Sequence, residues 1–202
     1  MRGIMGSVTK RSANKCLLWL GATILLLQLQ TPLLAESIRF KEKPGPVLDI
    51  ALDTETWYQA ANTKLTTKSK EIWTVAYLPQ GQTLKNYQQV FQFEFDAWQG
   101  KTYSPSELFQ QFIKFGKRRF QDFHAAAVPM APPVENSILY QWDATGPDNT
   151  RYFEIRRLIT APEGVYHLVY RARNKEDVAD TSARWVDLLK KAALKTPTAN
   201  HK

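Results

Sequence analysis

The sequence predicts an α+β domain: a twisted antiparallel sheet of about five to six strands, covered on one face by two helices. Three observations predict this fold. One run alternates strictly between apolar and polar residues, two stretches have helical periodicity, and three β-rich runs are separated only by short turns. The chain has 202 residues, of which 44% are hydrophobic and 23% charged, as in an ordinary globular protein.

The first 35 residues are typical of a secretory signal peptide and are not expected to belong to the fold. All four charged residues in this segment are basic, and an apolar run, 16–27, follows them. Ala35 is a small residue at the predicted cleavage point, so the processed chain would begin at Glu36.

An uncleaved membrane anchor is the alternative, because residues 16–35 could span a bilayer, which takes about 20 residues. Gln28, Gln30 and Pro32 weaken this alternative. Under both interpretations the basic flank stays in the cytoplasm and the body crosses the inner membrane. The expected location is the periplasm, with secretion or retention by an N-terminal anchor as the alternatives.

Removing the signal segment changes the charge balance. The whole chain has 27 basic and 19 acidic residues, a net charge of +8, but without the four basic residues of the segment the net charge is +4. So mild a charge argues against a nucleic-acid partner. The single cysteine, Cys16, also lies in the segment, so the processed chain has no thiol for catalysis, redox chemistry or metal binding.

The rest of the chain is expected to form one domain, at 47–195. Residues 36–46 are polar and contain proline and glycine, which predicts a leader, and residues 196–202 predict a flexible tail. The β-rich run 71–79 predicts a strand that ends at a proline. After a short turn, Phe91, Phe93 and Phe95 alternate with polar residues and predict a half-buried strand.

The next element is predicted to be an amphipathic helix from about 105 to 123. Ser104 and Glu107 form a capping box with Pro105 at the first helical position. The expected buried arc also contains Gly116, which would allow a close approach to the sheet, and Arg119, which would have to snorkel. The large apolar residues of the arc are Leu108, Phe109, Phe112, Ile113, Phe115, Phe120 and Phe123.

Three strands and a second helix complete the domain. The strands are expected at about 137–143, 150–160 and 164–173, and short turns make them an antiparallel meander. Within the second of them Arg157 falls on the apolar face, which predicts a bulge or a strand end nearby. The helix is expected at about 175–195, with acidic residues near its start and lysines near its end.

The segment from Tyr77 to Tyr87, YLPQGQTLKNY, resembles a motif of small exported proteobacterial proteins of unassigned function, V/L-P-x-G-x-T-L-x-N-W/Y. Tyr87 stands where a Trp is common, and the resemblance covers about residues 70–192. A weaker analogy links the architecture to the PsbP/Mog1-like fold. The resemblance implies a location and a fold, and no catalytic residue. We expect the motif to be structural, with Leu84 and Tyr87 both buried on one side of a helical turn.

Motifs for catalysis or cofactor binding are absent from the sequence: it has no nucleophile elbow, P-loop, dinucleotide fingerprint or zinc-protease motif. No cofactor is predicted. No metal site is predicted either, because the three histidines have no evident set of further ligands.

One polar constellation is predicted on the outer face of the sheet, away from the helices. Alternation along the strands places Glu154, Arg156, His167 and Arg171 on this face, and Glu94 can join them from the neighbouring strand. Such a group could bind a polar ligand or support acid–base chemistry. The alternative is a solvated face with cross-strand ion pairs.

A basic cluster on the first helix is a second candidate surface. Lys114, Lys117 and Arg118, with Arg119 beside them, could dock on an anionic membrane surface, or could be an ordinary solvated helix face.

The sequence therefore favours a non-enzymatic binding or accessory module of the bacterial envelope. Its partner would be an envelope protein or a small polar ligand. The high aromatic content, 12% of the residues, favours an interaction surface. The alternative is a small cofactor-free hydrolase or isomerase that uses His167 with Glu154.

Overall fold

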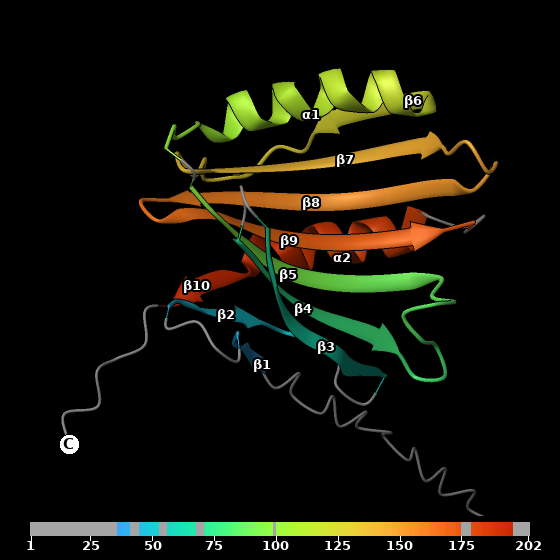
Figure 1. Ribbon diagram of the computed structural model, residues 1–202, viewed down its shortest axis with the longest axis horizontal. Coiled ribbons are helices and arrows are strands. Elements are labelled where there is room, and N and C mark those ends of the chain that lie inside the picture. The colour runs from blue at the N-terminus through green and yellow to red at the C-terminus, as the bar shows by residue number, and fades with distance from the viewer. Residues whose placement is uncertain are drawn as a thin grey trace, which may run out of the picture. The chain divides into compact units, whose positions relative to one another are not determined.

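A seven-stranded antiparallel sheet is the centre of the fold in the computed structural model (Figure 1). The structure describes residues 36–40, 45–52, 56–67, 71–98, 100–174 and 179–195, all within one compact unit, Pro32–Lys202. The strand order is β3-β4-β5-β9-β8-β7-β6. The strands are β3 (Trp57–Thr66), β4 (Glu71–Pro79), β5 (Gln89–Ala97), β6 (Gln121–Ala127), β7 (Ser137–Thr145), β8 (Arg151–Ala161) and β9 (Gly164–Arg173).

The predicted antiparallel α+β fold is confirmed, but the sheet is larger than the predicted five to six strands. Strands β4, β5, β7, β8 and β9 lie where the sequence predicts them. The two additional strands, β3 and β6, form the edges of the sheet. Both expose most of their side chains, so neither needs the apolar alternation by which strands are recognised in a sequence.

A second, three-stranded sheet contradicts the predicted polar leader. It has the order β1-β2-β10 and consists of β1 (Glu36–Ile38), β2 (Val47–Ile50) and β10 (Ala193–Lys195). Ile38 and Phe40 are buried in the core, and Phe40 stacks on Phe93 with ring centroids 4.6 Å apart. The polar composition of residues 36–46 conceals these two apolar residues. The predicted signal segment and the predicted tail lie outside the described residues.

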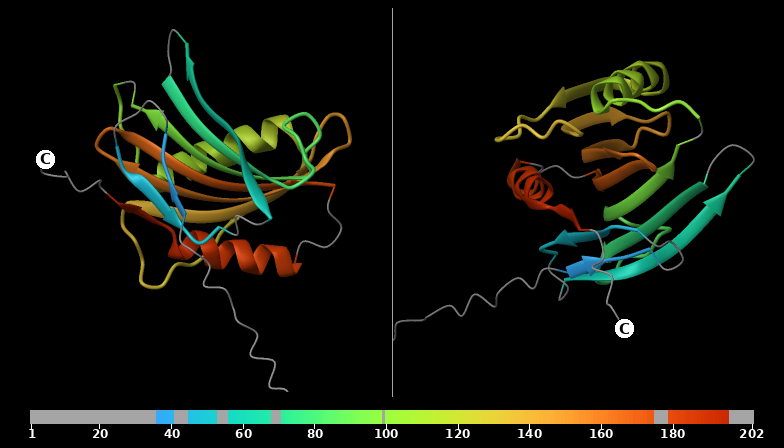
Figure 2. Two further views of the ribbon diagram at one scale, coloured as in Figure 1. Left: turned by 90° about the horizontal axis from the view of Figure 1, so that it is seen from below. Right: turned by 90° about the vertical axis from the view of Figure 1, so that its left-hand side faces the viewer.

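The two helices, α1 (Pro105–Arg119) and α2 (Ala179–Lys191), cover opposite faces of the large sheet (Figure 2). Alternation along β8 demonstrates this: Leu158 packs in one cluster with Phe109 of α1, whereas its neighbour Arg157 bonds to the end of α2. The prediction that both helices cover one face is wrong. The outer face carries enough apolar surface at its β6–β8 end, including Tyr140 and Trp142, to bury a helix.

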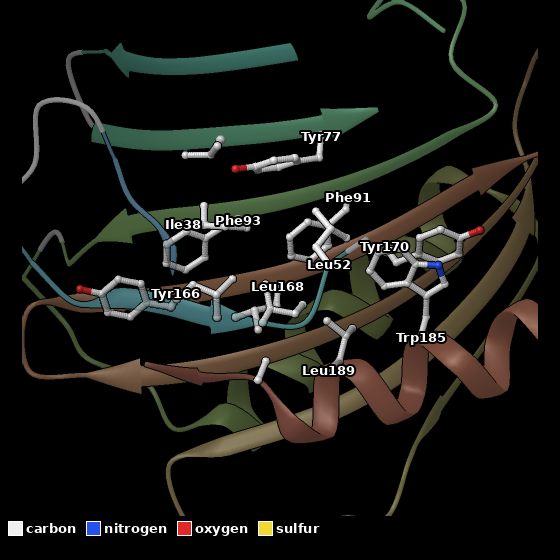
Figure 3. Packing of buried hydrophobic residues seen from close by; sticks show 14 of the residues in the cluster. Ile38, Leu52, Tyr77, Phe91, Phe93, Tyr166, Leu168, Tyr170, Trp185 and Leu189 are labelled. Carbon is white, nitrogen blue, oxygen red and sulfur yellow. The ribbon is translucent and has the colours of Figure 1, made fainter. Parts of the chain in front are cut away.

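The face under α2, here called the α2 face, is an aromatic core (Figure 3). Alternate residues of β5 and β9 point into it, as the phenylalanine pattern predicts. The indole of Trp185 lies 4.4 Å from the ring of Tyr170 and 5.4 Å from that of Phe91, measured between centroids. The three-stranded sheet closes this core from the other side.

Arg157 is the charged residue buried in the α2 face, and the predicted bulge is wrong. The strand keeps regular register through Arg157, which pairs with Leu139 and Leu168. Its guanidinium donates to the carbonyls of Leu189 and Ala192 at 2.8 and 2.7 Å. Carbonyls at the end of a helix have no partner within the helix, so a cation there both bonds them and complements the helix dipole.

Helix α1 begins with the predicted capping box. The hydroxyl of Ser104 accepts from the backbone N–H of Glu107 at 3.2 Å, and the Glu107 carboxylate accepts from the N–H of Ser104 at 2.8 Å. The helix ends at Arg119, not near Phe123 as predicted, because Asp122 adopts a positive φ and β6 begins. Gly116 is buried, and a Cβ there would overlap the ring of Phe123. Among the described residues, no helix is long and apolar enough to cross a bilayer.

Candidate functional site

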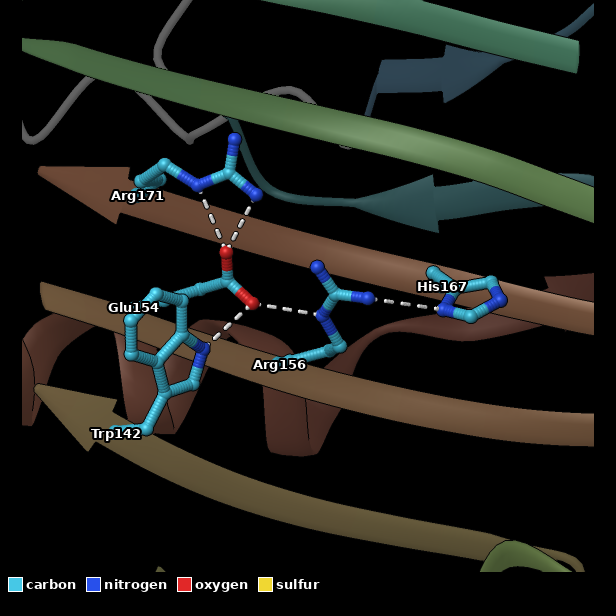
Figure 4. Close-up of polar contacts among 5 residues, drawn as sticks. All are labelled: Trp142, Glu154, Arg156, His167 and Arg171. Carbon is cyan, nitrogen blue, oxygen red and sulfur yellow. Dashed lines mark hydrogen bonds and ion pairs between the residues drawn. The ribbon is translucent and has the colours of Figure 1, made fainter. Parts of the chain in front are cut away.

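The five candidate residues predicted for the outer sheet face lie together on the face under α1, here called the α1 face. Figure 4 shows Glu154, Arg156, His167 and Arg171 with Trp142. Glu94 of β5 is paired in register with His167 of β9, and Glu154 of β8 with Arg171 of β9. Arg156 lies two residues beyond Glu154 on the same side of β8. Strand pairing therefore brings the five residues together, but the face is partly covered by α1 and is not the open, solvated surface of the alternative interpretation.

Glu154 is the anchor of the group, and its side chain is fully buried, with 0% exposure. One carboxylate oxygen accepts from the indole N–H of Trp142 at 2.9 Å and from Nε of Arg156 at 2.7 Å. The other accepts from Nε of Arg171 at 2.8 Å and lies 2.6 Å from its Nη2. Burial alone would raise the pKa of Glu154, but the two guanidiniums and the indole outweigh it and lower the pKa to about 2.

The two arginines are oriented by Glu154 but retain access to solvent. Their side chains are 16% exposed for Arg156 and 26% for Arg171. Nη1 of Arg156 lies 3.4 Å from Nδ1 of His167, which must accept because a guanidinium only donates. The phenol of Tyr87 forms a hydrogen bond with Arg171. A guanidinium carries more N–H donors than these contacts engage, so both can bond a further acceptor.

Glu94 differs from Glu154 in its electrostatics although both lie on the same face. Burial raises the pKa of Glu94, and the attraction of Arg156 and Arg171 offsets this only in part. The buried charge of Glu154 nearby raises the pKa further. Burial therefore disfavours the charged form of Glu94, whereas Glu154 is firmly ionised.

A hollow of about 630 Å³, here called the arginine hollow, lies beside this group between α1 and the sheet. Arg156 and Arg171 line it from the sheet, and Arg119 lines it from the end of α1. The remaining walls are mostly aromatic. They consist of Phe112, Phe115, Phe120, Trp142 and Tyr152, with Pro147 and Asp148 from the β7–β8 turn.

Phe115 is 53% exposed, which contradicts its predicted burial in the apolar arc of α1. The arc is wider than the strip of helix that contacts the sheet, so its edge residues face the hollow. Arg119, predicted to snorkel from the same arc, lies with its guanidinium 5.6 Å from the centroid of the Phe115 ring.

The other basic residues of α1 lie elsewhere. Lys114, Lys117 and Arg118 are exposed and do not line the arginine hollow. Lys117 and Arg118 belong to the last turn of the helix, where positive charge complements the dipole. The structure therefore separates Arg119 from the predicted basic cluster.

A second hollow of about 600 Å³ shares Tyr152 and Asp148 with the first and has a different character. Polar side chains dominate it: Asn86, Gln88, Gln89, Thr150, Arg173 and Asn174. The guanidinium of Arg173 lies 3.9 Å from the ring centroid of Tyr87 and 5.7 Å from that of Tyr152. Its Nε is buried and has no hydrogen-bond partner among the described residues.

Tyr87 belongs to the motif 77–87, whose predicted structural role holds only in part. Tyr87 packs against the buried cluster of Ala76, Leu78 and Val90, but Leu84 is 50% exposed, so the prediction that both are buried is wrong. The turn is held instead by Asn86, whose Oδ1 accepts from the backbone N–H of Thr83 at 2.9 Å. Tyr87 thus connects the motif to Arg171 and Arg173.

Several residues of the site are missing from the sequence-based prediction. Trp142 pairs in register with Glu154, a contact that depends on the register of β7 and β8 and that the sequence alone does not give. Phe112, Phe115 and Arg119 could not be placed, because the prediction put α1 on the other face of the sheet. His124, which directly follows the predicted end of the helix at about 123, lies in β6.

The geometry restricts the chemistry that this site can perform. A general base near neutral pH needs a pKa close to the working pH, whereas Glu154 has a pKa of about 2 and both oxygens bonded. Within the part of the chain that the structure describes, no group of three or more His, Cys, Asp or Glu residues is placed to hold a metal ion. The arrangement is suited to holding an anion.

Comparison with known proteins does not identify a family, so the resemblance of the motif at 77–87 stays a prediction. The chain matches no protein-family model, and a search of curated proteins found no significant match.

Proposed function

We propose that this protein is an exported, non-enzymatic binding module of the bacterial envelope that binds a small anionic ligand through Arg156 and Arg171. The observation that carries the proposal is the fully buried Glu154, which holds both guanidiniums at the floor of an aromatic-walled hollow. The volume of the hollow, about 630 Å³, is in the range of small-molecule sites, which favours a small ligand over a protein partner.

The energetics of the buried charges support a binding role. Removing a carboxylate and two guanidiniums from water costs several kcal/mol for each ion, and their mutual attraction does little more than offset that cost. Apolar side chains of similar volume would stabilise the sheet equally well. A cluster that gives the fold no net advantage, yet presents oriented N–H donors to a hollow, is explained by recognition of an acceptor.

Charge balance supports an anionic ligand. Arg156 and Arg171 together carry two positive charges against the single charge of Glu154, and burial raises the pKa of Glu94, which disfavours its charged form. Arg119 adds a further positive charge at the wall. Asp148 is the other acidic residue of the hollow, and its carboxylate already bonds the hydroxyl and N–H of Thr150.

Export rests on the N-terminal segment. Its basic flank, apolar run and small residue at position 35 are those of a signal peptide, and the chain after it has no cysteine that an oxidising compartment would alter. The hydrolase or isomerase alternative has no supporting observation, since Glu154 is firmly ionised and saturated and His167 is occupied by Arg156.

Two measurements test the proposal. For export, the protein expressed with its own N-terminal segment should appear in the periplasmic fraction with Glu36 as its first residue, and cytoplasmic protein that begins at Met1 would contradict this. For binding, calorimetry at low salt should detect benzoate or inorganic phosphate. Arg171→Met should abolish the signal, and the matched exposed control Arg118→Met should retain it. Equal binding by both variants would contradict the site.

A further inference from the structure

We infer that the ligand is a single-chain amphiphile: an anionic headgroup, carboxylate or phosphate, on an apolar tail that lies along the aromatic wall of the arginine hollow. This inference rests on the proposed function and specifies the class of ligand for the same site. It follows from the distribution of polarity along the two adjoining hollows.

The arginine hollow is charged at its floor and apolar along its side. Arg156 and Arg171 belong to the sheet, whereas Phe112 and Phe115 belong to α1 and stand above it. Phe112 contacts both layers, with its ring 5.6 Å from that of Trp142 and 6.0 Å from the guanidinium of Arg156. An anion at the floor therefore has an apolar wall beginning directly beside it.

The exposed ring of Phe115 extends this wall to the surface. A phenylalanine that is 53% exposed leaves apolar area in water, and burying that area beneath an alkyl chain would be favourable. Phe115 lies on the edge of the hollow next to Arg119. The tail is expected to leave the hollow past these two side chains.

The polar end of the same ligand can extend from the paired arginines into the second hollow. It shares Tyr152 and Asp148 with the arginine hollow, and the rest of its lining consists of amide side chains, Thr150, Tyr87 and Arg173. Arg173 lines this hollow, and its guanidinium has several N–H donors that can bond a headgroup oxygen. The spatial order of these surfaces, from the aromatic wall to the paired arginines to the polar hollow, matches an amphiphile with a polar head.

Chain length is the variable that tests this inference. The probes are inorganic phosphate and hexyl, octyl and decyl phosphate, each below its critical micelle concentration and titrated calorimetrically into the exported protein. Each added methylene that enters the hollow should tighten binding roughly two- to fourfold. Arg171→Met should weaken every probe about tenfold or more. Arg118→Met should change none.

The variant Phe115→Ala distinguishes the contribution of the tail to binding from that of the headgroup. Because Phe115 is largely exposed, the variant should fold like the wild type, with decyl phosphate binding at least about fivefold weaker and inorganic phosphate unchanged. Arg171-dependent binding that does not vary with chain length would overturn the inference and leave the proposed function intact. No Arg171-dependent binding of any probe would overturn both.

The source of the amphiphile is distinguished with vesicles. Co-sedimentation with phosphatidylglycerol vesicles that is lost in Phe115→Ala supports an amphiphile taken from a bilayer. Binding of decyl phosphate without co-sedimentation supports one taken from solution. A third outcome would overturn the inference and assign the membrane contact to the outer surface of α1. In this outcome alkyl phosphates do not bind, and vesicle binding survives Phe115→Ala and Arg171→Met. Vesicle binding is lost only when Lys114, Lys117 and Arg118 are replaced by Gln.

Discussion

The two faces of the seven-stranded sheet bury their side chains in different ways. On the α2 face, large aromatic residues from β5, β9 and α2 pack together, and the buried cation Arg157 bonds helix carbonyls. On the α1 face, apolar contacts surround a buried carboxylate and two arginines that are only partly satisfied by the chain. Both faces are formed by the same strands, so successive side chains of a strand such as β8 point alternately into one face and the other.

From this difference we expect one face to determine the stability of the fold and the other to hold the proposed binding site. Apolar burial stabilises by roughly 25 cal/mol for each Å² and needs no particular geometry. A buried ion cluster contributes about as much to the free energy of unfolding as apolar residues of similar volume would, but the loss of any one member is strongly destabilising. The α2 face should therefore govern stability, and the α1 face should govern binding.

The largest expected effect is on the α2 face, at Trp185. Trp185→Ala removes an indole packed against Trp57, Phe91 and Tyr170, and should cost roughly 3–5 kcal/mol of unfolding free energy. Urea denaturation measures it. The matched variant Trp185→Phe should cost less because much of the volume is kept. A loss below about 1 kcal/mol for the alanine variant would mean that this face does not dominate stability.

The next effect is on the α1 face, at Glu154. Glu154→Gln leaves two buried guanidiniums without their counter-charge and should cost about 3 kcal/mol. The triple variant Glu154→Leu, Arg156→Met, Arg171→Met should fall within about 1 kcal/mol of the wild type while losing anion binding. If the triple variant is as unstable as Glu154→Gln, the ion cluster belongs to the fold and the distinction between the faces fails.

A smaller effect is expected at the start of α1, the helix that covers the polar face. Ser104→Ala removes the acceptor of the capping box and should cost about 1 kcal/mol. The control Ser106→Ala lies within the helix at an exposed position and should be neutral or slightly stabilising. Equal denaturation midpoints for wild type and Ser104→Ala would show that the cap contributes nothing.

The smallest effect is a change in the pH dependence of stability. The pKa of Glu154 is lowered from 4.5 to about 2, so the stability it provides is present above 4.5 and is lost as the pH falls towards 2. The pKa of Glu94 is raised by burial, so its contribution is present below 4.5 and is lost as the pH rises through the raised value. Glu94→Gln should therefore gain stability relative to the wild type as the pH rises from 4 towards 7. Parallel stability curves would contradict the opposite roles of the two carboxylates.

The part of the α2 face that β5 contributes could be predicted from the sequence. Phe91, Phe93 and Phe95 alternate with polar residues, and strict alternation identifies both the strand and its buried side. The capping box identifies the start of α1 for the same reason, since both are local patterns. Strands β1, β2, β3, β6 and β10 have no such pattern, because they are short or lie at exposed edges of the large sheet.

The candidate site could be predicted only as a list of residues on one face. Strand parity places Glu154, Arg156 and Arg171 together, but their burial depends on where α1 packs, which is a tertiary property. Placing α1 on the wrong face made the site look open and concealed its aromatic wall. The second signal, Trp142 opposite Glu154, becomes visible only when the register of β7 and β8 is known.

The three-stranded sheet has a consequence for the connectivity of the chain. Strands β1 and β10 both pair antiparallel with β2 and therefore run parallel to each other, with Glu36 next to Ile50 and Lys195 next to Val47 at the opposite end of β2. The two outer strands are then about 10 Å apart, twice the spacing of neighbouring strands. A few glycines could join Lys195 to Glu36, and new ends could be opened at the exposed β7–β8 turn, residues 147–149. Such a circular permutant should keep the fold, since the linker would cross only one short strand and run back along its length.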